Sequence, residues 1–390
     1  MQNFDYYAPT RVAFGKNAEA RTGELVKAQK CKKVLVHYGG RSAKASGLLD
    51  RIFRSLTEEG ISYVELGGVV PNPRLSLVYE GIELCRKEGV DFVLAVGGGS
   101  AIDSAKAICY GLRNPFDVWD LYAGKVQAEA CAPLGAVLTI AAAGSEMSNS
   151  SVITNEDGWL KRGHNSDLSR PKFAIMNPEL TYTLPQYQTM SGCVDILMHT
   201  LERYFTTGET MDLTDRIAEQ LLRTVMENAR ILMRDPENYK ARAEVMWAGS
   251  LSHNGLTGLG ASGDWVSHKL EHELGGLFDV AHGAGLSAVW GSWARYVLEV
   301  KPERFAQFAV RVMDIEDTGG AKATALKGIE AMEAFFRSIE MPTSIRALGV
   351  TVTDEQIREM AHKCNESFGT LYGFRAIGEE DLVNIYTMAR

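Results

Sequence analysis

The first half of the chain alternates short runs of β-branched and other apolar residues with amphipathic stretches. The runs read KVLVH, ISYVEL, DFVLAV and LGAVLTI, at residues 33–37, 61–66, 91–96 and 134–140. Stretches whose apolar residues recur every three or four positions separate these predicted strands. A repeated strand–helix–strand order predicts an α/β domain with a parallel sheet that is covered by helices on both faces.

After about residue 185 the pattern becomes helical. Apolar residues recur at three- and four-residue spacings in residues 184–205, 214–233 and 325–341. Convincing strand patterns disappear there, which predicts an all-α domain. We therefore expect an α/β domain over residues 1–185 and a helical domain over residues 186–390, with the boundary in the proline-bracketed stretch at 177–185.

Composition and charge narrow the possible partners. The 390 residues include 41 Lys plus Arg and 49 Asp plus Glu, for a formal net charge of −8. Because no long basic run accompanies this balance, we expect no binding to nucleic acid or to a membrane surface. The longest apolar run, residues 132–144, is too short to span a bilayer. Six scattered cysteines without a C-x-x-C pair predict reduced thiols in a cytoplasmic protein.

A glycine loop follows the third predicted strand directly. The stretch Gly97-Gly98-Gly99-Ser100 leads into a predicted helix that begins near Ala101. Unpaired amides at a helix N-terminus bind phosphate, and glycines let a pyrophosphate approach them closely. The loop is neither G-x-G-x-x-G nor a Walker A sequence, since Lys106 lies a turn too far into the helix. A tight turn with Ser100 as the helix N-cap is the structural alternative.

The loop after the first of these strands, at residues 39–47, bears on the choice of nucleotide. NAD sites often place an acidic residue here for the ribose 2′-hydroxyl. This loop contains no acidic residue and offers Arg41, Ser42 and Lys44 instead. A 2′-phosphate fits such a loop, so the sequence favours NADP(H) over NAD(H), with a solvated basic loop as the alternative.

Five polar residues in the second half are candidate metal ligands. Asp195 and His199 lie four positions apart on one predicted helix, so both project from the same face. His268 and His272 show the same spacing on another predicted helix, and His282 follows on the next segment. A single histidine on an apolar helix face is usually a core residue, but one carboxylate with several imidazoles favours a divalent-metal site.

Residues 268–272 read H-K-L-E-H and also match the H-x-x-E-H signature of inverzincin peptidases. In that hypothesis His268 and His272 bind zinc and Glu271 acts as the base. The pattern is short enough to occur by chance, and it leaves Asp195 and His282 without a role. A peptidase also has no use for a strand, glycine loop and helix unit.

Taken together, these motifs resemble the iron-containing (group III) alcohol dehydrogenase family, most closely its NADP-using butanol dehydrogenase or aldehyde reductase branch. The resemblance covers nearly the whole chain. It is carried, in order, by PTRVAFGKNA, YGGRSAKASG, PNP, LAVGGGSAIDSAK, LTIAAAGSEMS, ELTYTLP, DILMHTLERY and HKLEHELGGLFDVAHG. Several independent motifs in the family's order are far more specific than any one of them.

The resemblance implies a Rossmann-like nucleotide domain, a helical metal-binding domain of the dehydroquinate synthase-like fold, and an active site in the cleft between them. It implies four metal ligands, which are Asp195, His199, His268 and His282. His272 matches a family histidine near the nicotinamide that does not hold the metal. The implied nucleotide positions are Gly39, Gly40, Ser42, Asn72, Gly98, Gly99, Ser100, Asp103, Thr139, Ser145, Ser148 and Lys161.

One departure from the family pattern concerns the nucleotide site. The family usually reads T-G-S-E where this chain has Ala143-Gly144-Ser145-Glu146. The missing threonine hydroxyl is expected to weaken nucleotide binding or to change how the phosphates lie.

The resemblance further implies a homodimer that transfers hydride between NAD(P)(H) and a small primary alcohol or aldehyde. One carboxylate with three imidazoles suits Fe²⁺ and also accommodates Zn²⁺, and family habit favours iron. The metal supplies Lewis-acid chemistry at the substrate oxygen. His272 is the titratable group best placed by spacing to assist proton release, through water or a ribose hydroxyl, which makes it the candidate catalytic residue.

Two other classes of function fit parts of the pattern. A non-redox lyase resembling dehydroquinate synthase also combines NAD with a metal, but it needs basic residues around a phosphorylated substrate, and none cluster near the metal motifs. A catalytically silent nucleotide-binding protein is the second. Intact ligand types at all four metal positions argue against it.

Overall fold

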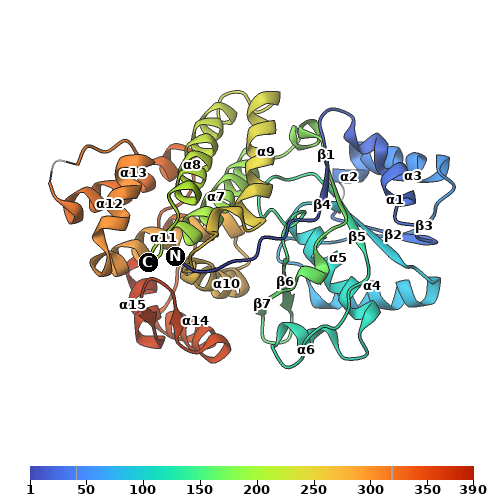
Figure 1. Ribbon diagram of the computed structural model, residues 1–390. Helices are drawn as coiled ribbons and strands as arrows, with labels where there is room; N and C mark the ends of the chain where they lie inside the picture. Colours follow the sequence, from blue (N-terminus) through green and yellow to red (C-terminus); the bar gives the residue numbers. More distant parts are fainter. Residues whose placement is uncertain (41, 318) are drawn as a thin grey trace. The chain divides into compact units, whose positions relative to one another are not determined.

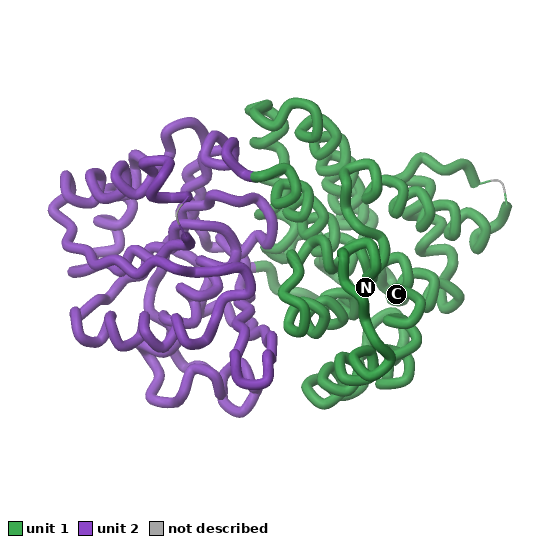
Figure 2. Tube along the Cα trace, turned by 180° about the vertical axis from the view of Figure 1, so that it is seen from behind, with its two compact units in different colours: residues 1–6, 185–390 green, residues 7–184 purple. Residues whose placement is uncertain are grey.

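The computed structural model describes residues 1–40, 42–317 and 319–390, which form two compact units. The α/β unit comprises residues 7–184, and the helical unit comprises residues 1–6 and 185–390 (Figure 2). Among the residues that the model describes, no helix is both long enough and apolar enough to cross a membrane.

A six-stranded sheet forms the centre of the α/β unit. Its strand order is β1-β8-β5-β4-β2-β3, and all five pairings are parallel. The strands are β1 (Arg11–Phe14), β2 (Lys33–Tyr38), β3 (Ser62–Leu66), β4 (Phe92–Gly97), β5 (Leu134–Leu138) and β8 (Phe173–Met176). The residues of β4 before Gly97 and all of β5 are buried, as expected where helices cover both faces of a sheet.

Helices cover this sheet on both sides. The helices of the α/β unit are α1 (Thr22–Lys27), α2 (Ser42–Ala45), α3 (Leu48–Glu58), α4 (Leu75–Glu88), α5 (Gly99–Arg113) and α6 (Val118–Tyr122), with 3-10 turns η1 (Ala18–Arg21), η2 (Asp167–Ser169) and η3 (Pro178–Thr181). Figure 1 shows α1 and α3 on one face, and α4 and α5 on the other. The predicted fold class, a parallel α/β sheet with a separate helical part, is confirmed.

The strand order places two loops side by side at one edge of the sheet. From β2 the chain moves outward to β3 and then returns to the other side of β2 to form β4. At such a switch point the loops after the two central strands diverge and leave a crevice, where open α/β sheets bind ligands. Tyr38 pairs with Val96 in the register, so the loops beginning at Gly39 and Gly97 start at the same level.

Four strands of this unit were not predicted. Strands β1 and β8 have only four residues each, too few for a recognisable apolar run. The hairpin of β6 (Ser150–Asn155) and β7 (Leu160–Asn165) forms a separate antiparallel sheet. Its sequence is rich in Ser, Asn, Lys, Arg and His, so the alternation of apolar and polar residues that marks a strand is missing.

The helical unit contains nine α-helices among the residues that the model describes. They are α7 (Gln186–Tyr204), α8 (Asp212–Leu232), α9 (Tyr239–His253), α10 (Val266–Phe278), α11 (His282–Val297), α12 (Pro302–Arg311), α13 (Ala321–Ser338), α14 (Asp354–Phe368) and α15 (Glu379–Ala389). Short elements complete it: η4 (Leu256–Gly258), η5 (Leu298–Val300), η6 (Arg346–Leu348), β9 (Leu371–Tyr372) and β10 (Ala376–Ile377).

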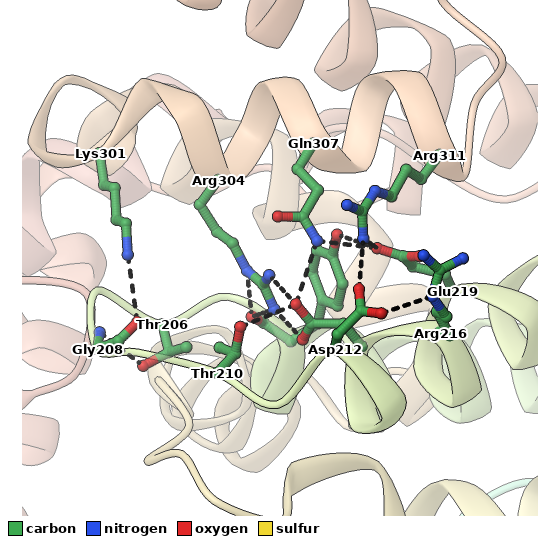
Figure 3. Close-up of polar contacts among 12 residues, drawn as sticks. Thr206, Gly208, Thr210, Asp212, Arg216, Glu219, Lys301, Arg304, Gln307 and Arg311 are labelled. Atoms are coloured by element: carbon green, nitrogen blue, oxygen red, sulfur yellow. Dashed lines mark hydrogen bonds and ion pairs between the residues drawn. The ribbon is translucent and has the colours of Figure 1, made fainter. Parts of the chain in front are cut away.

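A buried polar network fixes the C-terminal end of α7. Arg304 of α12 donates from Nε and Nη2 to the carbonyl oxygen of Tyr204, at 2.9 and 2.7 Å, and pairs with Asp215. Gln307 and Arg311 of the same helix point toward Glu219 of α8 (Figure 3). Arg304 therefore satisfies a helix-end carbonyl that has no partner within its own helix.

Gly135 of β5 supplies a test of the sheet packing. A Cβ atom at this position would lie 2.4 Å from Cζ of the buried Phe173 ring on the neighbouring β8. We expect Gly135→Ala to lower the free energy of unfolding by about 1–3 kcal/mol, the usual effect of overpacking a core, measured by urea denaturation. Gly163→Ala in β7 is the matched control, since its Cβ would lie 3.5 Å from Val152 Cγ2. Equal midpoints for the two variants would contradict the packing argument.

Candidate metal centre and nucleotide loops

Three helices of the helical unit carry the predicted metal ligands. Asp195 and His199 lie four residues apart on α7, and both side chains are buried. His268 belongs to the first turn of α10. Asp279, in the left-handed conformation with φ 51°, ends α10, and after a short link His282 begins α11.

Glycines let these helices approach one another. A Cβ at Gly283 would lie 1.9 Å from the carbonyl oxygen of Ser191 on α7. A Cβ at Gly285 would lie 2.8 Å from Cγ of Glu271 on α10. The residues that follow His282 are therefore small because α11 packs directly against both other ligand-bearing helices.

The ligand atoms converge around Asp195. Its Oδ1 lies 3.5 Å from His199 Nδ1, 3.8 Å from His268 Nε2 and 3.7 Å from His282 Nε2. Ligand atoms of Asp195, His268 and His282 all lie within 4.8 Å of one another. His199 lies beside this group, and its ring stacks on that of His268 with centroids 4.7 Å apart.

This donor set fits a divalent metal. Within the described chain, Asp195 Oδ1, His199 Nδ1 and His268 Nε2 are buried and have no hydrogen-bond partner. Their separations exceed hydrogen-bond lengths, whereas ligands about 2.1 Å from a tetrahedral ion lie about 3.4 Å apart. Buried acceptors left unpaired at this spacing are what a shared cation would satisfy.

Two buried glutamates orient the imidazoles. Glu202 Oε2 bonds His268 Nδ1, and Glu202 Oε1 accepts from the backbone amide of His268 at 3.0 Å. Glu271 Oε2 bonds His282 Nδ1 in the same way. Each carboxylate holds the Nδ1 side of a ring, so Nε2 faces the metal position. The sequence analysis missed Glu202, although it lies three residues after His199 on the same helix face.

Glu271 has a different role from the one that the peptidase hypothesis gives it. Its side chain is fully buried and bonded to His282. The structure groups His268 with Asp195 and His282, whereas that hypothesis pairs it with His272. The H-x-x-E-H spacing therefore reflects one predicted ligand, His268, and one carboxylate, Glu271, that bonds another histidine.

The surroundings shift the pKa values of two imidazoles in opposite directions. Burial lowers the pKa of His268, but the charges of Glu202 and Asp195 outweigh burial and raise it to about 9. Burial holds the pKa of His199 well below its usual range, and the neighbouring His253 lowers it further. A proton therefore competes with a cation at His268.

Two further histidines lie close to this centre. His272 is buried on α10, one turn after His268, and its ring centroid lies 6.0 Å from that of His282. His253, at the end of α9, lies 3.9 Å from His199 by ring centroids, and its Nδ1 accepts from Arg203 at 3.2 Å. The sequence analysis did not identify His253, because nothing in its own segment indicates that α9 packs here.

In the α/β unit, the glycine loop ends β4 and begins α5. The helix starts at Gly99, two residues earlier than predicted, with Gly98 as its N-cap. The alternative in which Ser100 caps the helix is wrong, because Ser100 already lies in the first turn. A Cβ atom on Gly98 would lie 3.0 Å from Ile140 Cβ, and a Cβ atom on Gly99 would lie 2.8 Å from Ala143 Cβ. These glycines therefore let the loop after β5 approach the helix N-terminus.

The loop after β2 begins with Gly39 and Gly40, and Ser42 starts α2. Arg41 lies outside the described residues. The Lys44 side chain is 61% exposed, and its Nζ lies 3.7 Å from Glu65 Oε2 on β3. An acidic group therefore reaches this loop from the neighbouring strand, which the sequence of the loop alone did not reveal.

The remaining predicted nucleotide positions lie around the same edge of the sheet or in the segment after β5. Asn72 is buried and adopts a left-handed conformation with φ 54°. Thr139 donates its amide to Gly97 at 3.0 Å, which joins the ends of β4 and β5. Lys161 is buried in β7.

The side chains of three other predicted nucleotide residues bond within the protein. Ser145 Oγ donates to Asp103 at 2.6 Å. Ser145 Oγ and Ser148 Oγ also accept from Lys106, at 3.0 and 3.4 Å.

Comparisons with known proteins indicate the same family over nearly the whole chain. A family model described as iron-containing alcohol dehydrogenase matches residues 9–178, and one described as the C-terminal part of the Fe-containing alcohol dehydrogenase family matches residues 189–390. The chain is 41% identical over 386 residues to a probable NADH-dependent butanol dehydrogenase of Bacillus subtilis, covering 99% of both chains. It is 36% identical over 353 residues to the NADPH-dependent aldehyde reductase YqhD of Escherichia coli, covering 90% of each.

A solved structure shows the same fold. The NADH-dependent butanol dehydrogenase A of Thermotoga maritima superimposes with a TM-score of 0.96 at 38% identity, covering 100% of this chain and 99% of that one.

Replacing Glu271 by glutamine tests the orienting role of its carboxylate. Glutamine keeps the size of the side chain but removes the charge that holds His282 Nδ1. We expect the dissociation constant for Fe²⁺ or Zn²⁺ to rise about 10–100-fold, measured by competition with a chelator. Glu330→Gln, at an exposed position of α13, is the control. Wild-type affinity in Glu271→Gln would remove this carboxylate from the metal centre.

Proposed function

The chain belongs to the iron-containing alcohol dehydrogenase family, and from this premise we propose that it is a metal-dependent oxidoreductase acting on small primary alcohols and aldehydes. In the proposed reaction, hydride passes between the substrate carbon and a nicotinamide nucleotide, NAD(H) or NADP(H). The observation that carries the proposal is the convergence of Asp195, His268 and His282, with His199 beside them, on unpaired buried donor atoms.

We propose Asp195, His199, His268 and His282 as the ligands of Fe²⁺, with Zn²⁺ as the alternative ion. A divalent cation supplies Lewis-acid polarisation of a carbonyl or hydroxyl oxygen. The protein's own contribution is orientation, because Glu202 and Glu271 keep two imidazoles turned with Nε2 toward Asp195. The Asp195 carboxylate supplies a negative charge to the ligand set.

His272 is the proposed proton-transfer residue. It is buried one helical turn from His268, and its ring lies near that of His282. Imidazole exchanges protons near neutral pH, as release or uptake of a proton at a substrate oxygen requires. His272 is not in the group of Asp195, His268 and His282, whose ligand atoms all lie within 4.8 Å of one another, so we assign it no ligand role.

For the nucleotide, we propose binding at the loops after β2, β4 and β5, with a preference for NADP(H). The exposed ammonium of Lys44 supports that preference, since it lies in the loop where a ribose 2′-phosphate is expected. Glu65 opposes it by partly neutralising the same ammonium, and the Bacillus and Thermotoga relatives carry NADH-dependent names. We also propose a cytoplasmic homodimer.

The activity is tested by following the absorbance of NADPH and NADH at 340 nm with butanal, after loading the protein with Fe²⁺ or Zn²⁺. We expect oxidation of the nucleotide by the loaded wild type. We expect His268→Ala to lose both bound metal and activity, because one ligand and its link to Glu202 disappear together. Metal content equal to the wild type in His268→Ala would refute the ligand assignment.

The role of His272 is tested separately. We expect His272→Ala to keep its metal and to lose about 10²–10⁴-fold in kcat, the usual contribution of a positioned acid–base group. His362→Ala, at an exposed position of α14, is the control for loss of a histidine. Wild-type turnover with an unchanged pH profile would exclude His272 from proton transfer.

Nucleotide preference is tested by the ratio of kcat/KM for NADPH and NADH. We expect the wild type to favour NADPH and Lys44→Ala to lose up to about fivefold of that preference, since an exposed ion pair is worth about 1 kcal/mol or less. Lys125→Ala, which removes another exposed ammonium of the same unit, is the control. A wild-type preference for NADH would refute the proposed NADP(H) specificity.

A further inference from the structure

A lysine with no role in the proposed reaction lies in the interior of the α/β unit. Lys106, on the second turn of α5, is completely buried. Buried lysines are rare unless their charge is compensated, so the contacts of this ammonium need an explanation.

The ammonium of Lys106 is surrounded by oxygens of one short turn. Its Nζ lies 2.8 Å from the carbonyl oxygen of Ser145, 3.0 Å from that of Ser148 and 2.7 Å from that of Ser150. The hydroxyl of Ser145 lies 3.0 Å away as well. An ammonium has three N–H donors, and three carbonyls of residues 145–150 converge on it.

Asp103 binds the same turn from one helical turn earlier on α5. One carboxylate oxygen accepts from the Ser145 hydroxyl at 2.6 Å, and the other accepts from the backbone amide of Val152 at 2.9 Å. Two opposite charges on one face of α5 therefore hold the turn and the start of β6, which follows it.

The charge on Lys106 is retained near neutral pH. Burial lowers its pKa to about 8, while the charges of Asp103 and Glu146 oppose that shift. Without the ammonium, three carbonyls would be left without this partner in a buried site, which is costly.

The turn lies next to the glycine loop. Residue 143, just before it, approaches the start of α5 closely enough that a Cβ at Gly99 would lie 2.8 Å from Ala143 Cβ. In a trans peptide the carbonyl and the following amide point in opposite directions. Because Lys106 draws the carbonyls of Ser145 and Ser148 toward α5, the amides of the next residues are directed away from it.

We infer that Lys106 is a positioning residue that fixes the 145–150 turn in its nucleotide-binding shape before the nucleotide arrives. The inference rests on the proposed nucleotide function, because Ser145 and Ser148 are among the proposed contacts. Lys106 acts on the nucleotide only through this turn.

Lys106→Met tests the inference, since methionine has similar length and no donors. We expect the dissociation constant for NADPH and NADH, measured by nucleotide fluorescence on metal-loaded protein, to rise at least tenfold. We expect KM for the nucleotide to rise similarly, while kcat at saturating nucleotide stays within about threefold of the wild type. Metal content should be unchanged. Lys125→Met, at an exposed position of the same unit, is the matched control.

A purely structural role predicts a different result: a lower melting temperature with wild-type nucleotide affinity in the folded protein, which would overturn the inference. If Lys106→Met does not fold, Lys106→Gln, which is shorter and keeps two N–H donors, is measured in the same way. A dissociation constant that is raised, by less than is expected for Lys106→Met, supports the inference, and wild-type affinity overturns it.

Backbone order parameters of the wild type, measured by NMR relaxation, give an outcome that depends on no variant. We expect residues 145–150 to be as rigid without nucleotide as with NADPH, because Lys106 already orders the turn. A turn that is mobile and becomes rigid only when NADPH is added would contradict preorganisation. A wild type that binds neither NADPH nor NADH would refute the proposed function itself, whereas equal binding by wild type and variant would refute only the role of Lys106.

Discussion

Three carboxylates buried in the helical unit constrain the metal centre. Glu202 and Glu271 each bond the Nδ1 side of an imidazole, whereas Asp195 Oδ1 has no hydrogen-bond partner within the described residues. A buried carboxylate oxygen without a hydrogen bond costs free energy unless a charge compensates it. The raised pKa of His268, about 9, lets a proton on that imidazole supply the charge, and a bound divalent cation would replace that proton. The packing of α7, α10 and α11, with Gly283 close to α7 and Gly285 close to α10, gathers the three carboxylates in one place.

Much of the architecture could be predicted from residue patterns. Strands β2 and β4 are recognisable because both of their faces are buried, so most of their residues are apolar. The hairpin of β6 and β7 lacks that signal, since its residues are mostly polar. Short strands such as β1 have too few residues to form a pattern. Prediction therefore succeeded for strands whose apolar runs are long enough to recognise and failed for strands that are very short or mostly polar.

Some residues of the candidate site could likewise be predicted from sequence, and others could not. Asp195 and His199 could be paired from sequence because a four-residue spacing on one helix places them on one face. The bond between Glu202 and His268 could not be predicted, because it depends on how α7 packs against α10. The residue spacing within either helix does not show which helices pack together. His253 was missed for the same reason. Side chains that act across helices become visible only when the helices are placed together.

The two units compensate buried charge in different ways, and each way matches the ligand proposed for that unit. In the α/β unit the cation is a side chain of the protein, because the Lys106 ammonium bonds three carbonyls of the 145–150 turn. That arrangement leaves the turn complete without ligand, as suits a nucleotide that binds and leaves in every reaction cycle. In the helical unit the atoms of Asp195, His199 and His268 that lack hydrogen-bond partners face one another, and a bound divalent cation would satisfy all three. An ion held by several buried ligand atoms would be part of the folded unit, as suits a cofactor that stays through many cycles.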